Sequence, residues 1–199
     1  MSDGSNGYDA CASHYIASRS SIGASTVRAW TASLPRGASV LDVGCGHGIP
    51  VTQALVDAGC RVSALDASPA LVAAFRTRFP DVPIACEPAE SAASFTRHHD
   101  AVVAWGLLFL LTPDGQRRVI ENAAGALKPG GQFLFTAPAD ACSWTDVLTG
   151  KDSTSLGAEA YRALLADVGL VVRVEGEDEG GNHYYIAVRA AARPTSPAS

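Results

Sequence analysis

The sequence predicts an α/β fold in which helices cover both faces of a mostly parallel sheet. From residue 38 onward, short β-branched and aliphatic runs alternate with segments whose apolar residues recur at helical spacing, a pattern typical of such a sheet. A glycine-spaced turn follows the first of these runs, and Asp66 ends the second. Because open α/β sheets bind ligands beyond the carboxyl ends of their strands, we expect a ligand site there.

The glycine-spaced turn links a buried strand over 40–43 to a helix. Its glycines, Gly44, Gly46 and Gly48, can adopt positive φ and leave space for ligand atoms against the backbone. The helix that follows offers unpaired N–H groups at its N-terminus. A P-loop needs a Lys-Ser/Thr pair that is missing here, and Ile49 stands where a dinucleotide fingerprint has glycine or alanine. The turn therefore favours a nucleoside without a pyrophosphate group.

An acidic residue, Asp66, stands at the end of the second predicted strand, 61–65. A carboxylate at this position can accept hydrogen bonds from both hydroxyls of a ribose, each worth roughly 1.5–3 kcal/mol. Asp42, two residues before the first glycine, is a second acidic residue beside the turn. The glycine turn alone is weak support for nucleoside binding, and the acid at the second strand tip strengthens it.

The segment Val-Leu-Asp-Val-Gly-Cys-Gly-His-Gly (40–48) resembles the first motif of class I S-adenosylmethionine-dependent methyltransferases. Asp66, followed by Ala67-Ser-Pro, resembles their second motif. The resemblance continues through Asp-Ala-Val-Val-Ala-Trp-Gly (100–106) and Leu-Lys-Pro-Gly-Gly (127–131). It is greatest to the small stand-alone bacterial members of the family.

The resemblance implies one methyltransferase domain over residues 1–199. Within it we expect an N-terminal helical cap (1–37), a Rossmann-like core (38–189) and a flexible tail (190–199). The core is expected to contain a seven-stranded, mostly parallel sheet with helices on both faces and the last strand antiparallel. The N-terminal helices are expected to form a lid over the site, and the implied cofactor is S-adenosylmethionine.

Residues 8–34 predict one or two helices with a break at 20–25. Tyr15 and Arg19 are four residues apart and fall on one helical face. In the methyltransferase plan this segment folds over the cofactor, which makes both side chains candidates to meet its methionyl carboxylate or the substrate. The alternative is a helix whose tyrosine packs and whose arginine is solvated.

Two further helices begin with the same signal, a hydroxyl side chain followed by proline, at Ser68 and Thr112. The first is expected to end at Pro80. The second is expected to end at Lys128, because Pro-Gly-Gly follows it. A fifth strand is then expected over 132–136.

A short third strand is expected over 82–86. In the methyltransferase family, the residue pair after this strand flanks the adenine of the cofactor, and an acidic side chain can accept from the exocyclic amine. Ala89 and Glu90 match that place, and Glu87 is the competing residue.

The fourth predicted strand, 100–105, ends in Trp105. At this strand tip the indole can stack on adenine or line the methyl pocket, and a place in the core is the alternative. Methyltransferases that act on adenine, cytosine or glutamine nitrogens carry an Asn/Asp-Pro-Pro-aromatic element here. This chain has Ala-Trp-Gly-Leu (104–107) instead, which disfavours those substrates.

Residues 137–155 are expected to form a long polar connection that starts at a strand tip. Loops of this length in compact domains are often functional. The alternative is a solvated crossover anchored by Trp144.

The C-terminal part predicts a helix over 159–168 and two strands, 170–174 and 183–188, joined by an acidic hairpin connection. His183 and Tyr184, near the expected mouth of the site, are candidates to bind or deprotonate a substrate. A histidine with a purely structural role is the alternative.

The balance of 15 basic and 20 acidic residues gives a net charge of −5, which argues against a nucleic-acid substrate. Five scattered cysteines without a CxxC pair indicate reduced thiols in a cytoplasmic protein and no metal site. No apolar run reaches the roughly 20 residues of a membrane helix, and no signal-peptide pattern opens the chain. The expected partner is a small-molecule acceptor, bound by a monomer or a homodimer.

The predicted function is transfer of a methyl group from S-adenosylmethionine to a small-molecule acceptor by in-line displacement. Holding nucleophile, methyl and sulfur in line can be worth roughly 7–11 kcal/mol and needs no metal. The expected cofactor-binding residues are Tyr15, Arg19, Asp42, Gly44, Gly46, Gly48, Asp66, Ala67, Ala89, Glu90 and Trp105. Two other classes stay open: a cofactor-binding sensor without catalysis, and a nicotinamide-dependent reductase, for which the required residue at position 49 and a Tyr/Lys pair are missing.

Overall fold

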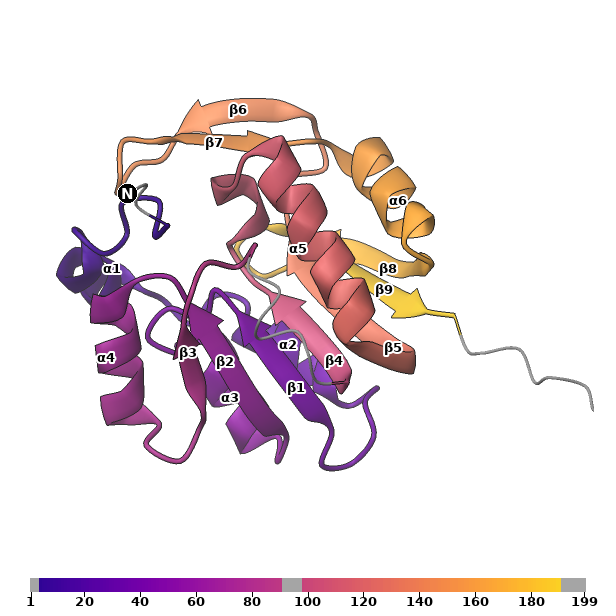
Figure 1. Cartoon of the computed structure of the whole chain (residues 1–199), viewed down its shortest axis with the longest axis horizontal. Helices are drawn as coiled ribbons and strands as arrows, with labels where there is room; N and C mark the ends of the chain where they lie inside the picture. Colours follow the sequence, from indigo (N-terminus) through magenta and orange to yellow (C-terminus); the bar gives the residue numbers. More distant parts are fainter. Residues whose placement is uncertain (1–3, 91–97, 191–199) are drawn as a thin grey trace, which may run out of the picture.

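The computed structural model describes residues 4–90 and 98–190. Its main element is a seven-stranded sheet in the order β3-β2-β1-β4-β5-β9-β8. Neighbouring strands from β3 to β5 are parallel, and β9 runs antiparallel to both β5 and β8 (Figure 1). The predicted seven-stranded sheet with an antiparallel last strand is confirmed.

The strands of this sheet are β1 (Ser39–Val43), β2 (Arg61–Asp66), β3 (Ile84–Cys86), β4 (His99–Ala104), β5 (Leu127–Thr136), β8 (Leu170–Glu177) and β9 (His183–Arg189). The helices are α1 (Ala12–Ser18), α2 (Ala24–Thr31), α3 (Val51–Asp57), α4 (Pro69–Arg78), the 3-10 turn η2 (Leu108–Leu110), α5 (Pro113–Ala126) and α6 (Ala158–Asp167). A separate antiparallel hairpin consists of β6 (Cys142–Thr145) and β7 (Asp152–Ser155).

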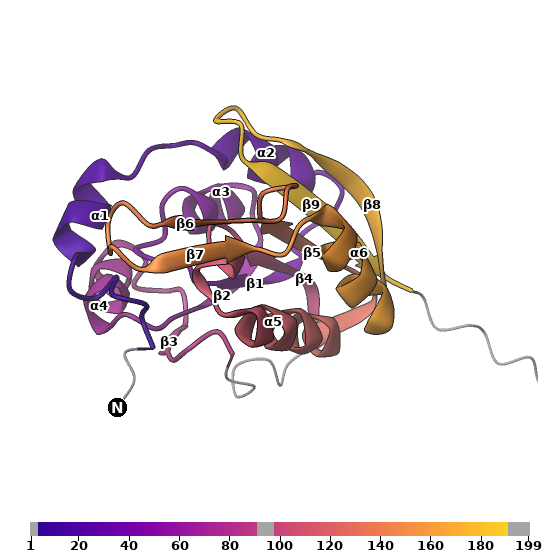
Figure 2. The ribbon, with the colours of Figure 1, turned by 90° about the horizontal axis from the view of Figure 1, so that it is seen from above.

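Both faces of the sheet are buried because its central strands are apolar at successive positions. On one face Val40 and Val103 pack with α2 and α3, and on the other Leu41 and Val102 pack with α5 and α6. Viewed from above, α2 and α3 lie on one side of the sheet and α5 on the other (Figure 2). Near-continuous apolar strands are the expected consequence of such double covering.

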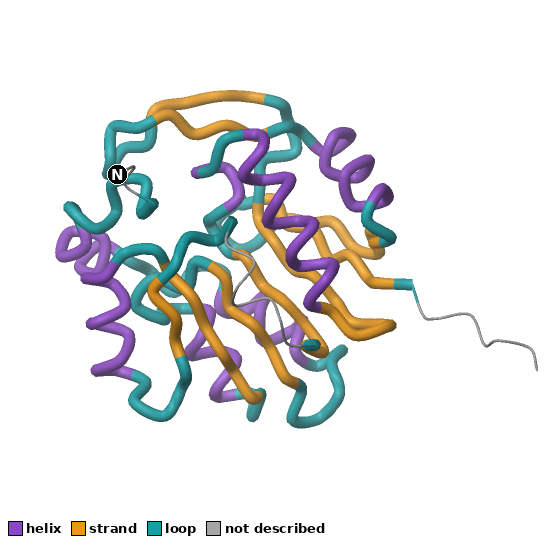
Figure 3. The backbone as a smooth tube through the Cα atoms, viewed as in Figure 1, coloured by secondary structure: helices purple, strands orange, loops and turns teal. Residues whose placement is uncertain are grey.

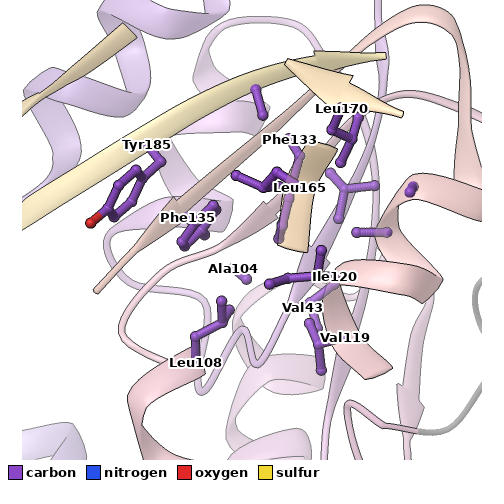
Figure 4. Close-up of a cluster of buried hydrophobic side chains, with 14 of the residues drawn as sticks. Val43, Ala104, Leu108, Val119, Ile120, Phe133, Phe135, Leu165, Leu170 and Tyr185 are labelled. Carbon is purple, nitrogen blue, oxygen red and sulfur yellow. The ribbon is translucent and has the colours of Figure 1, made fainter. Parts of the chain in front are cut away.

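The larger core cluster lies between the sheet and helices α5 and α6. Figure 4 shows Phe133 and Phe135 of β5 beside Tyr185 of β9, with Ile120 of α5 and Leu165 of α6 in the same cluster. The ring of Phe135 stacks on that of Tyr185 at a centroid distance of 4.7 Å. Aromatic pairs of this kind add about 0.5–1.5 kcal/mol to the burial of their area.

The predicted helix starts are confirmed by hydrogen bonds at their caps. The hydroxyl of Ser68 accepts from the N–H of Leu71 at 3.2 Å, and that of Thr112 accepts from the N–H of Gly115 at 3.2 Å. The predicted break in the N-terminal helical segment is also confirmed, because α1 ends at Ser18 and α2 begins at Ala24.

The expectation of a long polar loop over 137–155 is wrong. This segment contains the β6–β7 hairpin, which arches over the upper end of the sheet in Figure 1. The indole of Trp144 packs against Phe109 of η2 at a centroid distance of 5.3 Å, so the hairpin is anchored as the alternative reading expected. Its strands consist mainly of polar residues, including the buried Ser153 and Ser155, and therefore lack the apolar–polar alternation that would reveal them in the sequence.

The expected end of the fifth helix is also wrong. Helix α5 ends at Ala126, and the following Leu-Lys-Pro-Gly-Gly segment already belongs to β5. Lys128 does not cap the helix and instead pairs with Asp100 of β4 at 2.7 Å. Of the predicted flexible tail, 190–199, only Ala190 lies within the described residues.

The loops that follow β1, β2 and β4 gather at one edge of the sheet, below the β6–β7 hairpin (Figure 3). This arrangement follows from the parallel direction of the three strands. Any side chain at these strand tips therefore shares one space with the hairpin above it.

We expect Tyr161→Phe to lower the free energy of unfolding by about 1–3 kcal/mol, because it leaves a buried acceptor unpaired. The phenol of Tyr161 donates to Gln116 at 2.6 Å and accepts from the N–H of Leu156 at 3.2 Å. Urea denaturation measures the loss. Tyr185→Phe is the matched control, because the buried hydroxyl of Tyr185 has no partner among the described residues and its removal should be neutral or stabilising. Equal losses in the two variants would contradict this account.

Candidate functional site

A cavity of about 320 Å³ lies at the carboxyl ends of β1, β2 and β4. The predicted site residues that line it are Tyr15, Arg19, Gly44, Gly46, Asp66, Ala67, Ala89, Glu90 and Trp105. Four others do not line it: Asp42, Gly48, His183 and Tyr184. The structure thus brings most of the residues expected to bind cofactor into one space, and leaves the two catalytic candidates outside it.

The three glycines of the turn all have positive φ, but they face different neighbours. A Cβ on Gly46 would lie 2.9 Å from the phenol oxygen of Tyr15, which lines the cavity. A Cβ on Gly48 would lie 2.2 Å from the ring of Phe79, in the core behind the turn. Gly46 therefore allows Tyr15 to approach the turn at the cavity wall, whereas Gly48 allows α4 to pack against the turn.

Asp66 holds the glycine turn through its carboxylate. One oxygen, Oδ2, accepts from the N–H of Gly46 at 2.8 Å, and Oδ1 accepts from the N–H of Ser68 at 2.9 Å. Burial raises the pKa of this carboxyl, and the two N–H groups partly offset that effect. Each oxygen keeps a further lone pair for a ligand hydroxyl, because a carboxylate oxygen has two.

Asp42 lies beneath the turn and not in the cavity lining. Its side chain is 1% exposed, and Oδ2 accepts from the hydroxyl of Thr52 at 2.6 Å. Burial raises its pKa to about 7, although the Thr52 hydrogen bond acts in the opposite direction. Asp42 therefore links β1 to α3 and supports the turn from behind.

Tyr15 and Arg19 of the N-terminal segment reach the cavity together. The guanidinium of Arg19 lies 5.4 Å from the centre of the Tyr15 ring, and its Nε donates to the carbonyl of Ile49 at 3.3 Å. In the described part of the chain no carboxylate forms an ion pair with Arg19. His47 packs edge-on against Tyr15 at 5.8 Å, and burial, with smaller effects of nearby arginines, lowers its pKa to about 4. Arg19 is thus a cation available to a ligand.

Ala89 and Glu90 line the cavity after β3, whereas the competing Glu87 does not. Trp105 lines the cavity and is also part of the core, being 7% exposed. Its indole stacks on Tyr184 at 6.5 Å. Trp105 therefore meets both expectations, since one part of its side chain packs in the core and another part faces the cavity.

The two catalytic candidates lie on β9, outside the lining. His183 stands 3.6 Å from Glu175 and packs edge-on against Tyr185. Tyr184 is on the opposite face of β9, behind Trp105. Either residue can act on the site only through a neighbour in this structure.

The outer wall of the cavity includes residues that were not among the expected site residues. Asn6 and Tyr8 precede α1, Phe109 lies on η2, Asp146 lies in the turn between β6 and β7, and Asn182 precedes β9. The position of Asp146 in a long polar segment after a strand tip was a usable signal. Nothing in the sequence marks Asn6.

A family model described as a methyltransferase domain matches residues 40–131. Over these residues the chain is similar to methyltransferase domains. The ubiquinone biosynthesis O-methyltransferase of Coxiella burnetii is 31% identical over 105 residues, covering 51% of this chain and 44% of that protein. The chain therefore aligns with less than half of the length of this curated relative.

Solved structures share the fold of the methyltransferase domain over almost the whole chain. The CcbJ methyltransferase of Streptomyces caelestis superposes with a TM-score of 0.76 at 18% identity, covering 96% of this chain and all of that one. A Burkholderia thailandensis N1-methyltransferase, crystallised with 1,6-didemethyltoxoflavin and S-adenosylhomocysteine, superposes with a TM-score of 0.71 at 20% identity. The match covers 92% of this chain and 89% of that one. At these identities the likeness establishes the fold, and the predicted fold class is confirmed.

Within residues 4–90 and 98–190, no helix is long and apolar enough to span a bilayer. Over the same residues, no group of three or more His, Cys, Asp or Glu side chains is arranged to hold a metal ion.

The titration of Asp42 should make stability fall as the pH rises. Its pKa is about 7 in the folded chain and 3.8 in an unperturbed carboxyl. The folded state therefore binds more protons between these values and loses stability as pH increases through that window. Asp42→Asn keeps an acceptor for Thr52 and removes the titration.

We therefore expect the free energy of unfolding of Asp42→Asn, relative to that of the wild type, to increase when the pH is raised from about 5 to about 8. Urea denaturation at the two pH values measures the difference. Asp57→Asn, at an exposed site on α3, should follow the wild type. A parallel pH dependence of Asp42→Asn and wild type would show that Asp42 does not titrate in this range.

Proposed function

We propose that this chain transfers the methyl group of S-adenosylmethionine to a small-molecule acceptor. The main observation behind the proposal is the cavity at the carboxyl ends of β1 and β2. There the Asp66 carboxylate is hydrogen-bonded to the glycine turn and keeps lone pairs for a ligand. The similarity to methyltransferase domains over 40–131 supports the proposal. Related structures bound to S-adenosylmethionine or S-adenosylhomocysteine also support it.

The residues present fit this cofactor. The carboxylate of Asp66 would accept from the ribose hydroxyls, and the missing side chain of Gly46 lets the phenol of Tyr15 lie against the turn beside them. Ala89 and Glu90 would flank the adenine. The guanidinium of Arg19, without a carboxylate partner in the described residues, would bind the methionyl carboxylate.

Bound S-adenosylmethionine supplies a methyl carbon activated by a sulfonium, so an acceptor lone pair can form the new bond as the carbon–sulfur bond breaks. The chain contributes by orientation, because restricting both reactants can be worth roughly 7–11 kcal/mol. Trp105 and Leu107 wall the cavity next to the glycine turn. The N-terminal segment, acting as a cap, and the β6–β7 hairpin would close the space over the acceptor and exclude water.

All five cysteines are free in the structure, which fits a reducing compartment. We extend the proposal to a cytoplasmic enzyme on this basis.

Asp66→Asn should weaken S-adenosylhomocysteine binding about 10- to 100-fold, because it removes a charge-assisted hydrogen bond to the ribose and unpairs a turn N–H. Isothermal titration calorimetry measures the affinity. The matched control is Asp57→Asn on the exposed face of α3, which should bind as the wild type does. Undiminished affinity in Asp66→Asn would rule out the proposed binding mode.

Catalysis is tested separately by incubating the full chain with trideuteromethyl-labelled S-adenosylmethionine and a metabolite extract. Mass spectrometry should detect at least one labelled product that is missing from reactions with Asp66→Asn. Tight cofactor binding with no labelled product in any extract would point to a sensor protein.

A further inference from the structure

The outer half of the cavity contains polar side chains that the proposed cofactor contacts do not use. They come from three segments far apart in the sequence: Asn6 and Tyr8, Asp146, and Asn182. Their hydrogen-bond partners determine what chemical groups they can offer to an acceptor.

Asp146 presents a charged oxygen with spare capacity. Its Oδ1 accepts from both the N–H and the hydroxyl of Thr149, at 2.8 and 3.0 Å, and from the N–H of Leu148 at 3.0 Å. Among residues 4–90 and 98–190, its Oδ2 accepts only from the phenol of Tyr8, at 3.1 Å. Burial would raise the pKa of Asp146, but the Thr149, Leu148 and Tyr8 hydrogen bonds outweigh it and lower the pKa. The side chain is therefore an anion that can accept another hydrogen bond.

Asn182 presents its carbonyl oxygen. Its Nδ2 donates to both oxygens of the Asp178 carboxylate, at 3.1 and 2.9 Å, and its backbone N–H donates to the same group at 2.8 Å. Because an ionised carboxylate only accepts, the amide nitrogen must face Asp178. The Oδ1 atom is left without a partner among the described residues.

Asn6 follows the same pattern, because its Nδ2 donates to the carbonyl of Leu110 at 3.0 Å. The phenol of Tyr8 and the amide nitrogen of Asn182 thus donate within the protein, one N–H of Asn6 has no partner among the described residues, and the oxygens of all three side chains remain. The other polar groups of this half include the hydroxyls of Ser20 and Thr136, which can donate or accept. The outer half therefore presents mainly acceptors.

The charged side chains that line the whole cavity are Arg19, Asp66, Glu90 and Asp146. Arg19 is the sole cation in this described lining, and the proposed function assigns it to the cofactor. Lys151, in the same turn as Asp146, is not among the lining residues. Around these groups the wall is apolar, and it includes Trp105, Leu107, Phe109, Leu110 and Leu111.

We propose that the acceptor is a cationic amine with an apolar or aromatic body, whose ammonium group binds Asp146 and whose further N–H or O–H groups donate to the outer half of the cavity. This inference rests on the proposed function, since it takes the outer half to be the acceptor site. Carboxylate or phosphate acceptors are disfavoured, because they would bring acceptor oxygens toward acceptor oxygens and a negative charge toward Asp146.

Three probes that share one ring and differ in charge test the inference: tyramine (cation), 2-(4-hydroxyphenyl)ethanol (neutral) and 4-hydroxyphenylacetate (anion). Their binding to the full-length protein is measured by ligand-observed NMR, with and without S-adenosylhomocysteine. Tyramine should bind at least about tenfold more tightly than 4-hydroxyphenylacetate, the ratio expected for one charge-assisted hydrogen bond. The neutral probe should fall between them.

Asp146→Asn should bring the three affinities within about threefold of one another, because the charge is lost. The variant keeps Oδ1 for the Leu148 and Thr149 donors, and its Nδ2 can donate to the Tyr8 oxygen, so the turn is preserved. Asp152→Asn, an exposed change on the same hairpin, is the control and should keep the wild-type ratio. A merely structural role of Asp146 would shift thermal stability without changing this ratio.

The inference is overturned if 4-hydroxyphenylacetate binds as tightly as tyramine, if none of the probes binds at millimolar concentration, or if the tyramine preference survives in Asp146→Asn. These outcomes are distinct from failure of the proposed function, which shows as missing S-adenosylhomocysteine binding in calorimetry. If the protein binds the cofactor but prefers the anionic probe, the proposed function stands and only the inferred class of acceptor is wrong.

Discussion

The hydrogen bond from the N–H of Gly46 to Asp66 connects the turn after β1 to the tip of β2. The N–H groups of Gly44 and Cys45, which donate to the carbonyl of Leu65, make the same connection, and together these bonds fix a turn whose three glycines have positive φ. The carboxylate is 9% exposed, so it stays in place only if its oxygens are paired, as buried charges require. The same pairing aims it at the cavity. One side chain thus makes the structural contact and, in the proposed function, the ligand contact.

The sequence was most informative where periodicity and caps act locally. Strands β1 and β2 and the starts of α4 and α5 follow from apolar runs and from the hydroxyl-proline pairs at Ser68 and Thr112. The β6–β7 hairpin was missed because its polar strands are held by packing on η2 rather than by their own pattern. For the same reason, a Pro-Gly-Gly segment that normally ends a helix extends β5, where pairing with β4 decides the outcome.

In the candidate site, too, some residues could be predicted from local sequence and others depend on the tertiary fold. Asp66 and Glu90 could be located because they lie at the end of β2 and shortly after β3, and the ends of parallel strands meet at one edge. Gly48 was expected at the cavity for its place in the motif, but its neighbour is Phe79 of the core. Asn6, Asp146 and Asn182 could not be chosen individually from the sequence, since only the tertiary fold shows which residues of an N-terminal segment and two hairpins face one space.

The most direct measurement of the central claim is a crystal structure of the protein grown with S-adenosylhomocysteine. The account predicts that the ribose hydroxyls lie within hydrogen-bonding distance of the Asp66 carboxylate, with the homocysteine carboxylate toward Arg19. An empty cavity, or a ribose held elsewhere while the Asp66 oxygens keep only their backbone partners, would contradict it.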